Sequence, residues 1–270
     1  GQALLRLKRP AEAIRHLVEA RDAGGEPSLA QMTRAAIERL QRNPKGYVLL
    51  VEGGRIDHAH HAGNAHRALS DAGALSDAVR VADAMTSADD TLIVVTADHS
   101  HVLHFAGYPT RGNPILGLVK GGSGEGGDPG KLARDSTGRP YTTLGYGNGP
   151  GYAGATNASA EGPKRFGHDT RGFKPAQGRP DLTAVDTTGP DYLQEAMLPL
   201  GSETHGGEDV GVWARGPGST AVRGSIEQNA LFHIMLQATP RLRQALCDKG
   251  LCDASGVPVE LPRAADFRVR

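Results

Sequence analysis

Apolar residues recur at helical spacing in several segments of the chain, and these segments predict helices. The first runs over about 29–40 behind Ser28, a residue type that commonly caps helix starts. A second covers about 69–88, with apolar positions three and four residues apart. A third follows Ser225, where Ser-Ile-Glu-Gln matches a capping box. Each helix is expected to bury its apolar face.

Short apolar and β-branched runs predict strands between these helices. One run covers 47–52, a second covers 91–96 and a third covers 210–214. A strand, a helix and a second strand in succession form a βαβ unit, so 47–52 and 91–96 are expected to pair in parallel. The pattern therefore predicts an α/β fold.

Residues from about 106 to 200 lose this periodicity, because Gly, Pro, Ser and Asp dominate there. The run 121–127 is too rich in Gly to pack a core, and no Lys-Ser/Thr pair follows it, so a phosphate-binding P-loop is not indicated. We interpret the region as a surface insertion. Residues 1–25 form two helical stripes broken at Pro10, and we assign no function to them.

Length and charge narrow the classes of protein. A chain of 270 residues accommodates one large α/β domain or two smaller ones. A formal net charge of +0 argues against nucleic acid or an anionic membrane surface as a partner. No apolar run approaches the roughly 20 residues that cross a bilayer, and no signal peptide is recognisable at the start.

Asp, Glu and His gather in three clusters, at 52–61, 98–101 and 203–209. Asp57 and His61 are four residues apart and share one face if this segment is helical. A carboxylate oxygen and an imidazole nitrogen on one face make half of a zinc site. A solvated His-rich loop is the alternative for the first cluster. Two clusters follow the ends of predicted strands, where ligand sites gather in α/β sheets, and this favours the metal site.

The motifs V-E-G-G-R-I-D-H-A-H-H, T-A-D-H-S-H and E-T-H-G-G-E-D-V resemble those of alkaline phosphatases. The resemblance runs in order from about Glu26 to about Cys252, and we take 26–270 as part of one such domain. It implies a three-layer α/β/α fold whose central sheet is incomplete in this chain, with a crown-like insertion at about 106–200. Open strand edges would make the chain poorly stable or prone to aggregation.

The resemblance also implies two zinc ions and one magnesium ion, which together hydrolyse phosphate monoesters through a phosphoserine intermediate. The implied ligands are Asp57, His61 and His205 for the first zinc, Asp98 and His99 for the second zinc, and Glu52 for magnesium.

Other residues near these motifs have implied supporting roles. His58 corresponds to a position that contacts phosphate through water, and His101 lies beside a ligand. Tyr108 corresponds to a tyrosine that reaches into the neighbouring subunit of a homodimer. Glu203 and Glu208 are expected to orient the loop that carries the third histidine ligand. The remaining histidines of these segments are not expected to bind metal; they are His60, His66 and His104.

The family's serine nucleophile lies in an Asp-Ser-Ala motif that this chain does not contain. Asp135-Ser136-Thr137 follows the ligand motifs and does not match it. The chain therefore resembles the C-terminal half of an alkaline phosphatase and is expected to be inactive alone. A phosphodiesterase or sulfatase of the same superfamily, or a metal-binding fragment without turnover, are the alternatives.

The resembled enzymes are exported and often carry a small C-terminal disulfide. The resemblance therefore implies a periplasmic or extracellular location and a local disulfide between Cys247 and Cys252. Two reduced thiols in a cytosolic protein are the alternative.

Overall fold

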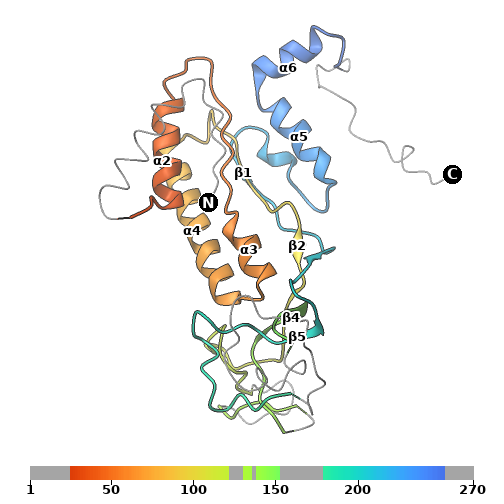
Figure 1. Cartoon of the computed structure of the whole chain (residues 1–270). Coiled ribbons are helices and arrows are strands. Elements are labelled where there is room, and N and C mark those ends of the chain that lie inside the picture. Colours follow the sequence, from red (N-terminus) through yellow and green to blue (C-terminus); the bar gives the residue numbers. More distant parts are fainter. Residues whose placement is uncertain (1–24, 122–129, 136–137, 153–178, 253–270) are drawn as a thin grey trace, which may run out of the picture. The chain divides into compact units, whose positions relative to one another are not determined.

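A computed structural model describes residues 25–121, 130–135, 138–152 and 179–252 (Figure 1). The helices are α2 (Leu29–Leu40), α3 (Arg55–His61), α4 (Ala65–Met85), the short 3-10 helix η2 (Ser219–Ala221), α5 (Gln228–Gln237) and α6 (Pro240–Cys247). The strands are β1 (Ile93–Val95), β2 (Ser100–His101), β3 (Leu103–Phe105), β4 (Leu144–Gly149), β5 (Ala196–Pro199), β6 (His205–Gly206) and β7 (Trp213–Arg215). The helical stripes expected within residues 1–25 lie outside the described residues, except for the last position.

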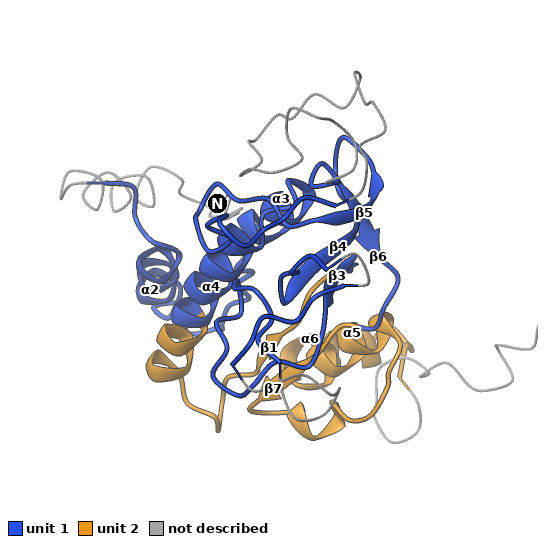
Figure 2. Ribbon diagram, turned by 90° about the horizontal axis from the view of Figure 1, so that it is seen from below, with its two compact units in different colours: residues 1–78, 99–209 blue, residues 79–98, 210–270 orange. Residues whose placement is uncertain are grey.

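The chain divides into two compact units, shown in different colours in Figure 2. The first unit comprises Gly1–Ala78 and His99–Asp209, and the second comprises Val79–Asp98 and Val210–Arg270. The three ligand clusters of the sequence fall mainly in the first unit, which contains α2, α3 and the start of α4.

Helix α2 begins where the sequence predicts it. The side chain of Ser28 accepts a hydrogen bond from the backbone N–H of Gln31 at 3.2 Å, and Gln31 accepts one from the backbone N–H of Ser28 at 2.8 Å. This reciprocal pair is a capping box, which satisfies two of the N–H groups that a helix start leaves without partners.

A tight junction joins α3 to α4, which lie side by side in Figure 1. Gly63 has φ +68 and donates to the carbonyl of His60, while Asn64 donates to the carbonyl of Ala59. This pairing ends a helix on a left-handed glycine. The side chain of Asn64 then caps α4 by accepting from the backbone N–H of Arg67. Helix α4 therefore begins four residues before its predicted start, at Ala65.

The expected parallel pairing of 47–52 with 91–96 would join residues of the two units, and it stays a prediction. Residues 47–52 belong to no strand, although their exposure alternates, with Val48 81% and Leu50 73% exposed. Among the residues that the structure describes, none of the sheets includes this segment, and its alternating exposure is typical of an extended backbone. Strand β1, which lies within the predicted 91–96, pairs antiparallel with β7, with Val94 opposite Ala214.

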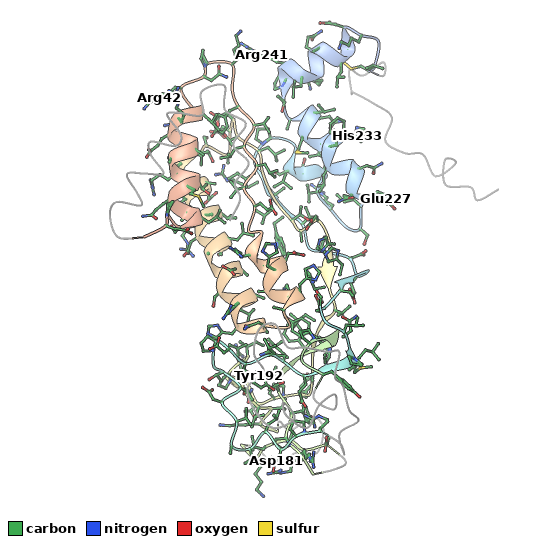
Figure 3. The ribbon with its side chains drawn as sticks, in the orientation of Figure 1. Arg42, Asp181, Tyr192, Glu227, His233 and Arg241 are labelled. Carbon is green, nitrogen blue, oxygen red and sulfur yellow. A yellow bond between two sulfur atoms is a disulfide. The ribbon has the colours of Figure 1, made fainter. Side chains whose placement is uncertain are left out.

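The region 106–200 contributes more to the core than its composition predicts. Strand β4 pairs antiparallel with β3 and parallel with β5. Leu144 and Tyr146 from β4 pack with Ala65 and Ala196 in a buried cluster. Tyr192, labelled in Figure 3, is also fully buried. The described parts of this region therefore include buried residues, and the assignment of the region as an insertion stays a prediction.

An ion pair and a disulfide connect segments within the second unit. Arg215 donates from Nε to the carboxylate of Asp83 at 2.6 Å, which ties β7 to the end of α4. Helix α5 begins after Glu227 without a side-chain cap, so the capping box predicted at Ser225 does not form. Cys247 and Cys252 form a disulfide with a Cα–Cα distance of 4.7 Å.

None of the helices within the described ranges is both long and apolar enough to cross a membrane.

Candidate metal centre

Helix α3 presents Asp57 and His61 on one face, because residues four apart in a helix lie one turn apart. The side-chain atoms Asp57 Oδ1 and His61 Nε2 lie 3.4 Å apart. The helix can form despite its short length because Asp57 is in its first turn, where a negative charge is favourable, and Gly63 ends it.

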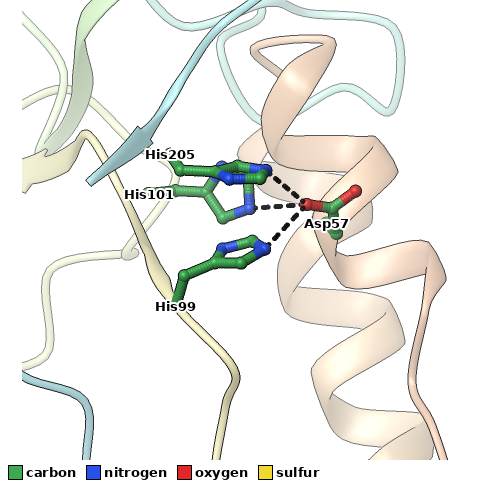
Figure 4. Close-up of side chains that lie close together, drawn as sticks. All are labelled: Asp57, His99, His101 and His205. Atoms are coloured by element: carbon green, nitrogen blue, oxygen red, sulfur yellow. Dashed lines mark hydrogen bonds and ion pairs between the residues drawn. The ribbon is translucent and has the colours of Figure 1, made fainter. Parts of the chain in front are cut away.

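Strands β2 and β6 bring three further histidines to the same place. His101 on β2 lies directly opposite His205 on β6, and His99 immediately precedes β2. Side chains at directly opposed positions project from the same face of a pair of strands. Figure 4 shows His99, His101 and His205 directing their rings toward one carboxylate oxygen of Asp57.

The distances around Asp57 define a compact set of donor atoms. From Asp57 Oδ1, the Nε2 atoms lie at 3.1 Å for His101, 3.4 Å for His205 and 3.8 Å for His99. The Nε2 atoms of His61 and His205 are 3.1 Å apart. Asp57, His99, His101 and His205 each offer one ligand atom, and these atoms all lie within 4.8 Å of one another.

These spacings fit a zinc ion. Tetrahedral ligands at about 2.0–2.1 Å from zinc are separated from one another by roughly 3.3 Å. The triangle of Asp57, His61 and His205 has sides of 3.4, 3.4 and 3.1 Å. One carboxylate oxygen and two imidazole nitrogens are also ligand types that zinc prefers. The donor set could therefore hold a divalent metal ion, and zinc at these three residues stays a prediction.

A buried carboxylate lies behind the histidines. Glu203 is 1% exposed, and its Oε2 lies 2.7 Å from Nδ1 of His101. Its Oε1 accepts from the backbone N–H of Val102 at 2.7 Å. Its backbone carbonyl lies 2.5 Å from Nδ1 of His61. His61, His101 and Glu203 also form a second group of potential metal ligands, which overlaps the first.

The surroundings set the charge of Asp57. Partial burial alone would raise its pKa, but the neighbouring His61, His101 and His205 outweigh burial and hold the pKa below its ordinary value. The carboxylate is therefore ionised at neutral pH, as a metal ligand must be.

A tyrosine and a neutral histidine support the ring of His101. Burial lowers the pKa of His60 to about 4, with His101 as a further cause. Its Nδ1 lies 2.9 Å from the hydroxyl of Tyr146, and its ring stacks on His101 with centroids 4.6 Å apart. Burial raises the pKa of Tyr146 and the charge of Glu203 raises it further, so the hydroxyl stays protonated. His60 thus packs against a site histidine without belonging to either group of potential ligands.

The groups of potential ligands found among the described residues do not include Glu52, Asp98 or His58. Glu52 and His58 are both exposed, and His58 lies on α3. Tyr108 is 67% exposed. The structure thus brings together four of the expected ligands, which are Asp57, His61, His99 and His205.

His101, expected only to lie beside a ligand, lies in both groups of potential ligands. The sequence did contain a sign that His101 could join the site, because His99 and His101 are two residues apart. In an extended segment residues at that spacing lie on one face. The burial of Glu203 had no such signal, because a glutamate in a Gly-rich polar segment is usually exposed.

The motif positions and the donor geometry together define a candidate metal-binding site. The chain matches the family model described as "Alkaline phosphatase" over residues 15–240. The chain therefore belongs to the alkaline phosphatase family.

Individual relatives support this assignment. The chain is 43% identical to the tissue-nonspecific isozyme of alkaline phosphatase from Gallus gallus over 235 residues, which are 87% of this chain and 39% of that protein. It is 42% identical to the isozyme of that name from Homo sapiens over 213 residues, 79% of this chain and 35% of that protein. It is 41% identical to alkaline phosphatase from Gadus morhua over 213 residues, 79% of this chain and 38% of that protein. The chain thus spans between 35% and 39% of the length of these relatives.

Proposed function

We propose that this chain supplies the metal-binding part of an enzyme that hydrolyses phosphate monoesters. The single observation that carries the proposal is the triangle of donor atoms from Asp57, His61 and His205, with spacings that suit tetrahedral zinc. Membership of the alkaline phosphatase family supplies the reaction class. In this proposal the three side chains hold the first of two zinc ions.

The remaining metal positions are assigned by the family motifs. Asp98 and His99 hold the second zinc, and Glu52 is a ligand of magnesium, which prefers carboxylate oxygens. The assignment of His99 to the second zinc rests on its motif position; its Nε2 lies 3.8 Å from Asp57 Oδ1. His58 contacts the phosphate group through water.

Bound zinc and magnesium would neutralise charge on the attacking and leaving oxygens of an in-line phosphoryl displacement. The protein's part in this chemistry is to hold the donor atoms in place before substrate arrives. Asp57 provides an ionised carboxylate, and the two faces of the site come from α3 and the β2–β6 pair. Rigid elements fix such a constellation more closely than mobile loops do.

The nucleophile is proposed to lie in a preceding part of a longer protein. The sequence contains no Asp-Ser-Ala motif, and the phosphoserine intermediate requires that serine. Without a nucleophile and the arginine that clamps phosphate, the chain alone lacks covalent catalysis and substrate positioning. The absence of the Asp-Ser-Ala motif also favours a second candidate function, that of a metal-binding fragment without turnover.

The longer protein is proposed to be an exported homodimer. Its crown-like insertion corresponds to about 106–200, and Tyr108 reaches toward the neighbouring subunit. The 67% exposure of Tyr108 supports this role, because a side chain that reaches a partner must be accessible in the single chain. No nucleic-acid partner is proposed, in keeping with the formal net charge of +0.

Two measurements on the 270-residue chain test the proposal. The first is zinc affinity, measured by competition with a chromogenic chelator. Asp57→Ala and His205→Ala should each weaken binding at least about tenfold, because each removes one ligand of a tetrahedral set. Asp191→Ala is the matched control, since it removes an exposed carboxylate that is paired with Arg67. Equal zinc affinity in all four proteins would contradict the metal site.

The second measurement is hydrolysis of a chromogenic phosphate monoester at alkaline pH with zinc and magnesium added. We expect no turnover above that of the Asp57→Ala variant, because the chain lacks the nucleophile motif. Turnover that disappears with a chelator and in Asp57→Ala would show that the chain contains or recruits a nucleophile. In that case the placement of the serine outside this chain is wrong.

A further inference from the structure

We infer that Glu203 is a positioning residue, which sets the orientation of His61 and His101 and thereby the zinc affinity of the site. The inference rests on the proposed function, since it concerns the same metal site. It extends the expected role of Glu203, which concerned the loop of His205, to His61 and His101. Glu203 makes a contact at Nδ1 of each of these two histidines.

Both contacts have a fixed direction. The backbone carbonyl of Glu203 lies 2.5 Å from Nδ1 of His61, and a carbonyl oxygen can only accept a hydrogen bond. His61 must therefore carry its proton on Nδ1. A neutral imidazole with a proton on Nδ1 has its lone pair on Nε2, which is the atom 3.4 Å from Asp57 Oδ1.

The side chain of Glu203 acts in the same way on His101. Its Oε2 lies 2.7 Å from Nδ1 of His101, and its other oxygen accepts from the backbone N–H of Val102 at 2.7 Å. The second bond holds the carboxylate in one rotamer. His101 is thus the donor at Nδ1, and its Nε2 faces Asp57 Oδ1 at 3.1 Å. A carboxylate behind an imidazole both fixes the ring and makes it a better ligand or partner.

Glu203 also joins the two halves of the site. Its backbone N–H donates to the carbonyl of His61 at 2.9 Å, so Glu203 is bound to α3 through both of its peptide groups. Two residues later the chain enters β6 with His205, opposite His101. A change at Glu203 therefore reaches ligands on both α3 and the β2–β6 pair.

The burial of Glu203 argues that the carboxylate has a purpose beyond packing. A fully buried carboxylate is costly unless it is paired and hydrogen-bonded, and both oxygens of Glu203 have such partners. A glutamine would fill nearly the same volume. Its amide NH₂ would face Nδ1 of His101 as a donor and would move the ring proton to Nε2.

The test compares zinc affinity in the wild-type chain and Glu203→Gln, again by competition with a chromogenic chelator. Loss of the carboxylate behind a metal-site histidine typically weakens metal binding about 10- to 100-fold. Glu195→Gln is the matched control, because Glu195 is a largely buried carboxylate of the same unit that pairs with Arg179. It should bind zinc like the wild type. Zinc affinity of Glu203→Gln equal to that of the wild type would overturn the inference.

A double-mutant cycle separates positioning through His101 from a general effect of charge. In His101→Asn the amide nitrogen occupies about the place of Nδ1 and keeps a donor for Glu203, while the atom that faces Asp57 is removed. In that background Glu203→Gln should change zinc affinity by no more than about threefold, because residues that act through one another are not additive. Fully additive effects would overturn the inference.

A measurement on the wild-type chain does not depend on whether a variant folds. Long-range proton–nitrogen NMR spectra report which ring nitrogen of each histidine carries a proton. We expect protonated Nδ1 in His61 and His101, with and without zinc. An unprotonated Nδ1 in His101 would overturn the inference. A wild-type chain that does not bind zinc would instead contradict the proposed function, so the two failures are distinguishable.

Discussion

At the scale of single residues, Arg179 shows how an ion pair can hold a loop-rich region together. Its guanidinium donates to Asp135 and to Glu195 at 2.5 Å each, and to the carbonyl of Pro140 at 3.1 Å. Asp135 and Pro140 belong to one turn, and Glu195 comes from a distant segment of the first unit. Arg179→Met would leave two partly buried carboxylates without this partner. We expect the free energy of unfolding to fall by about 1–3 kcal/mol, measured by urea denaturation.

The control for this prediction is Arg67→Met. Arg67 pairs with Asp191, whose side chain is 74% exposed, and exposed pairs contribute about 0–1 kcal/mol. A loss in Arg179→Met no larger than in Arg67→Met would mean that the bridging geometry adds nothing to stability.

The proximity of several expected ligands could be predicted at this scale, but the contact that supports His101 could not. The spacing of Asp57 and His61 already indicated one helix face, and α3 brings the two side chains to 3.4 Å. The contact of His101 with Glu203 links residues 102 positions apart, and local sequence holds no information about such a pair. The positions of Glu52 and Asp98 at metal sites stay predictions.

At the scale of elements, local signals account for what the sequence predicted correctly. Helix α2 begins at its predicted cap because Ser28 and Gln31 complete a reciprocal pair within four residues. The start of α4 was missed because it depends on Asn64, which follows a helix-ending glycine and could be taken as part of the loop. The pairing of β1 was also missed, because its partner β7 lies more than a hundred residues away.

A glycine in α4 gives a prediction at this scale. Gly73 is exposed within the helix, and an added Cβ would have nothing within 4 Å. Gly73→Ala should raise the free energy of unfolding by about 0.5–1 kcal/mol, because alanine loses less backbone entropy in a helix. Chemical denaturation followed by circular dichroism measures the change.

Gly46 provides the matched control. An added Cβ there also has open space. However, the backbone φ of Gly46 is +84, a value that residues other than glycine rarely adopt. Gly46→Ala should therefore lower the free energy of unfolding. If both variants shift stability in the same direction, backbone conformation does not govern these two positions.

At the scale of the whole molecule, the segment 47–52 bears on whether chains associate with one another in solution. Tyr47, Leu49 and Val51 are half-buried, whereas Val48 and Leu50 are exposed. The segment thus has one covered face and one apolar face open to solvent, and it belongs to no sheet among the residues that the structure describes. Extended segments that expose apolar side chains are templates for pairing between chains.

We therefore expect Val48→Thr/Leu50→Thr to reduce self-association of the chain. Threonine keeps the preference for an extended backbone while replacing exposed apolar groups with hydroxyls. Light scattering over a range of protein concentrations should show a smaller mean particle mass than for the wild type. Zinc affinity should stay the same, because neither residue belongs to the groups of potential metal ligands.

Val51→Thr is the control, because it places the same side chain on the covered face of the same segment. It should lower the free energy of unfolding without reducing self-association, since a half-buried hydroxyl loses hydration while the exposed face stays apolar. Equal scattering from the wild type and the double variant would show that another surface drives association. In that event the alternating exposure of 47–52 would reflect only its extended backbone.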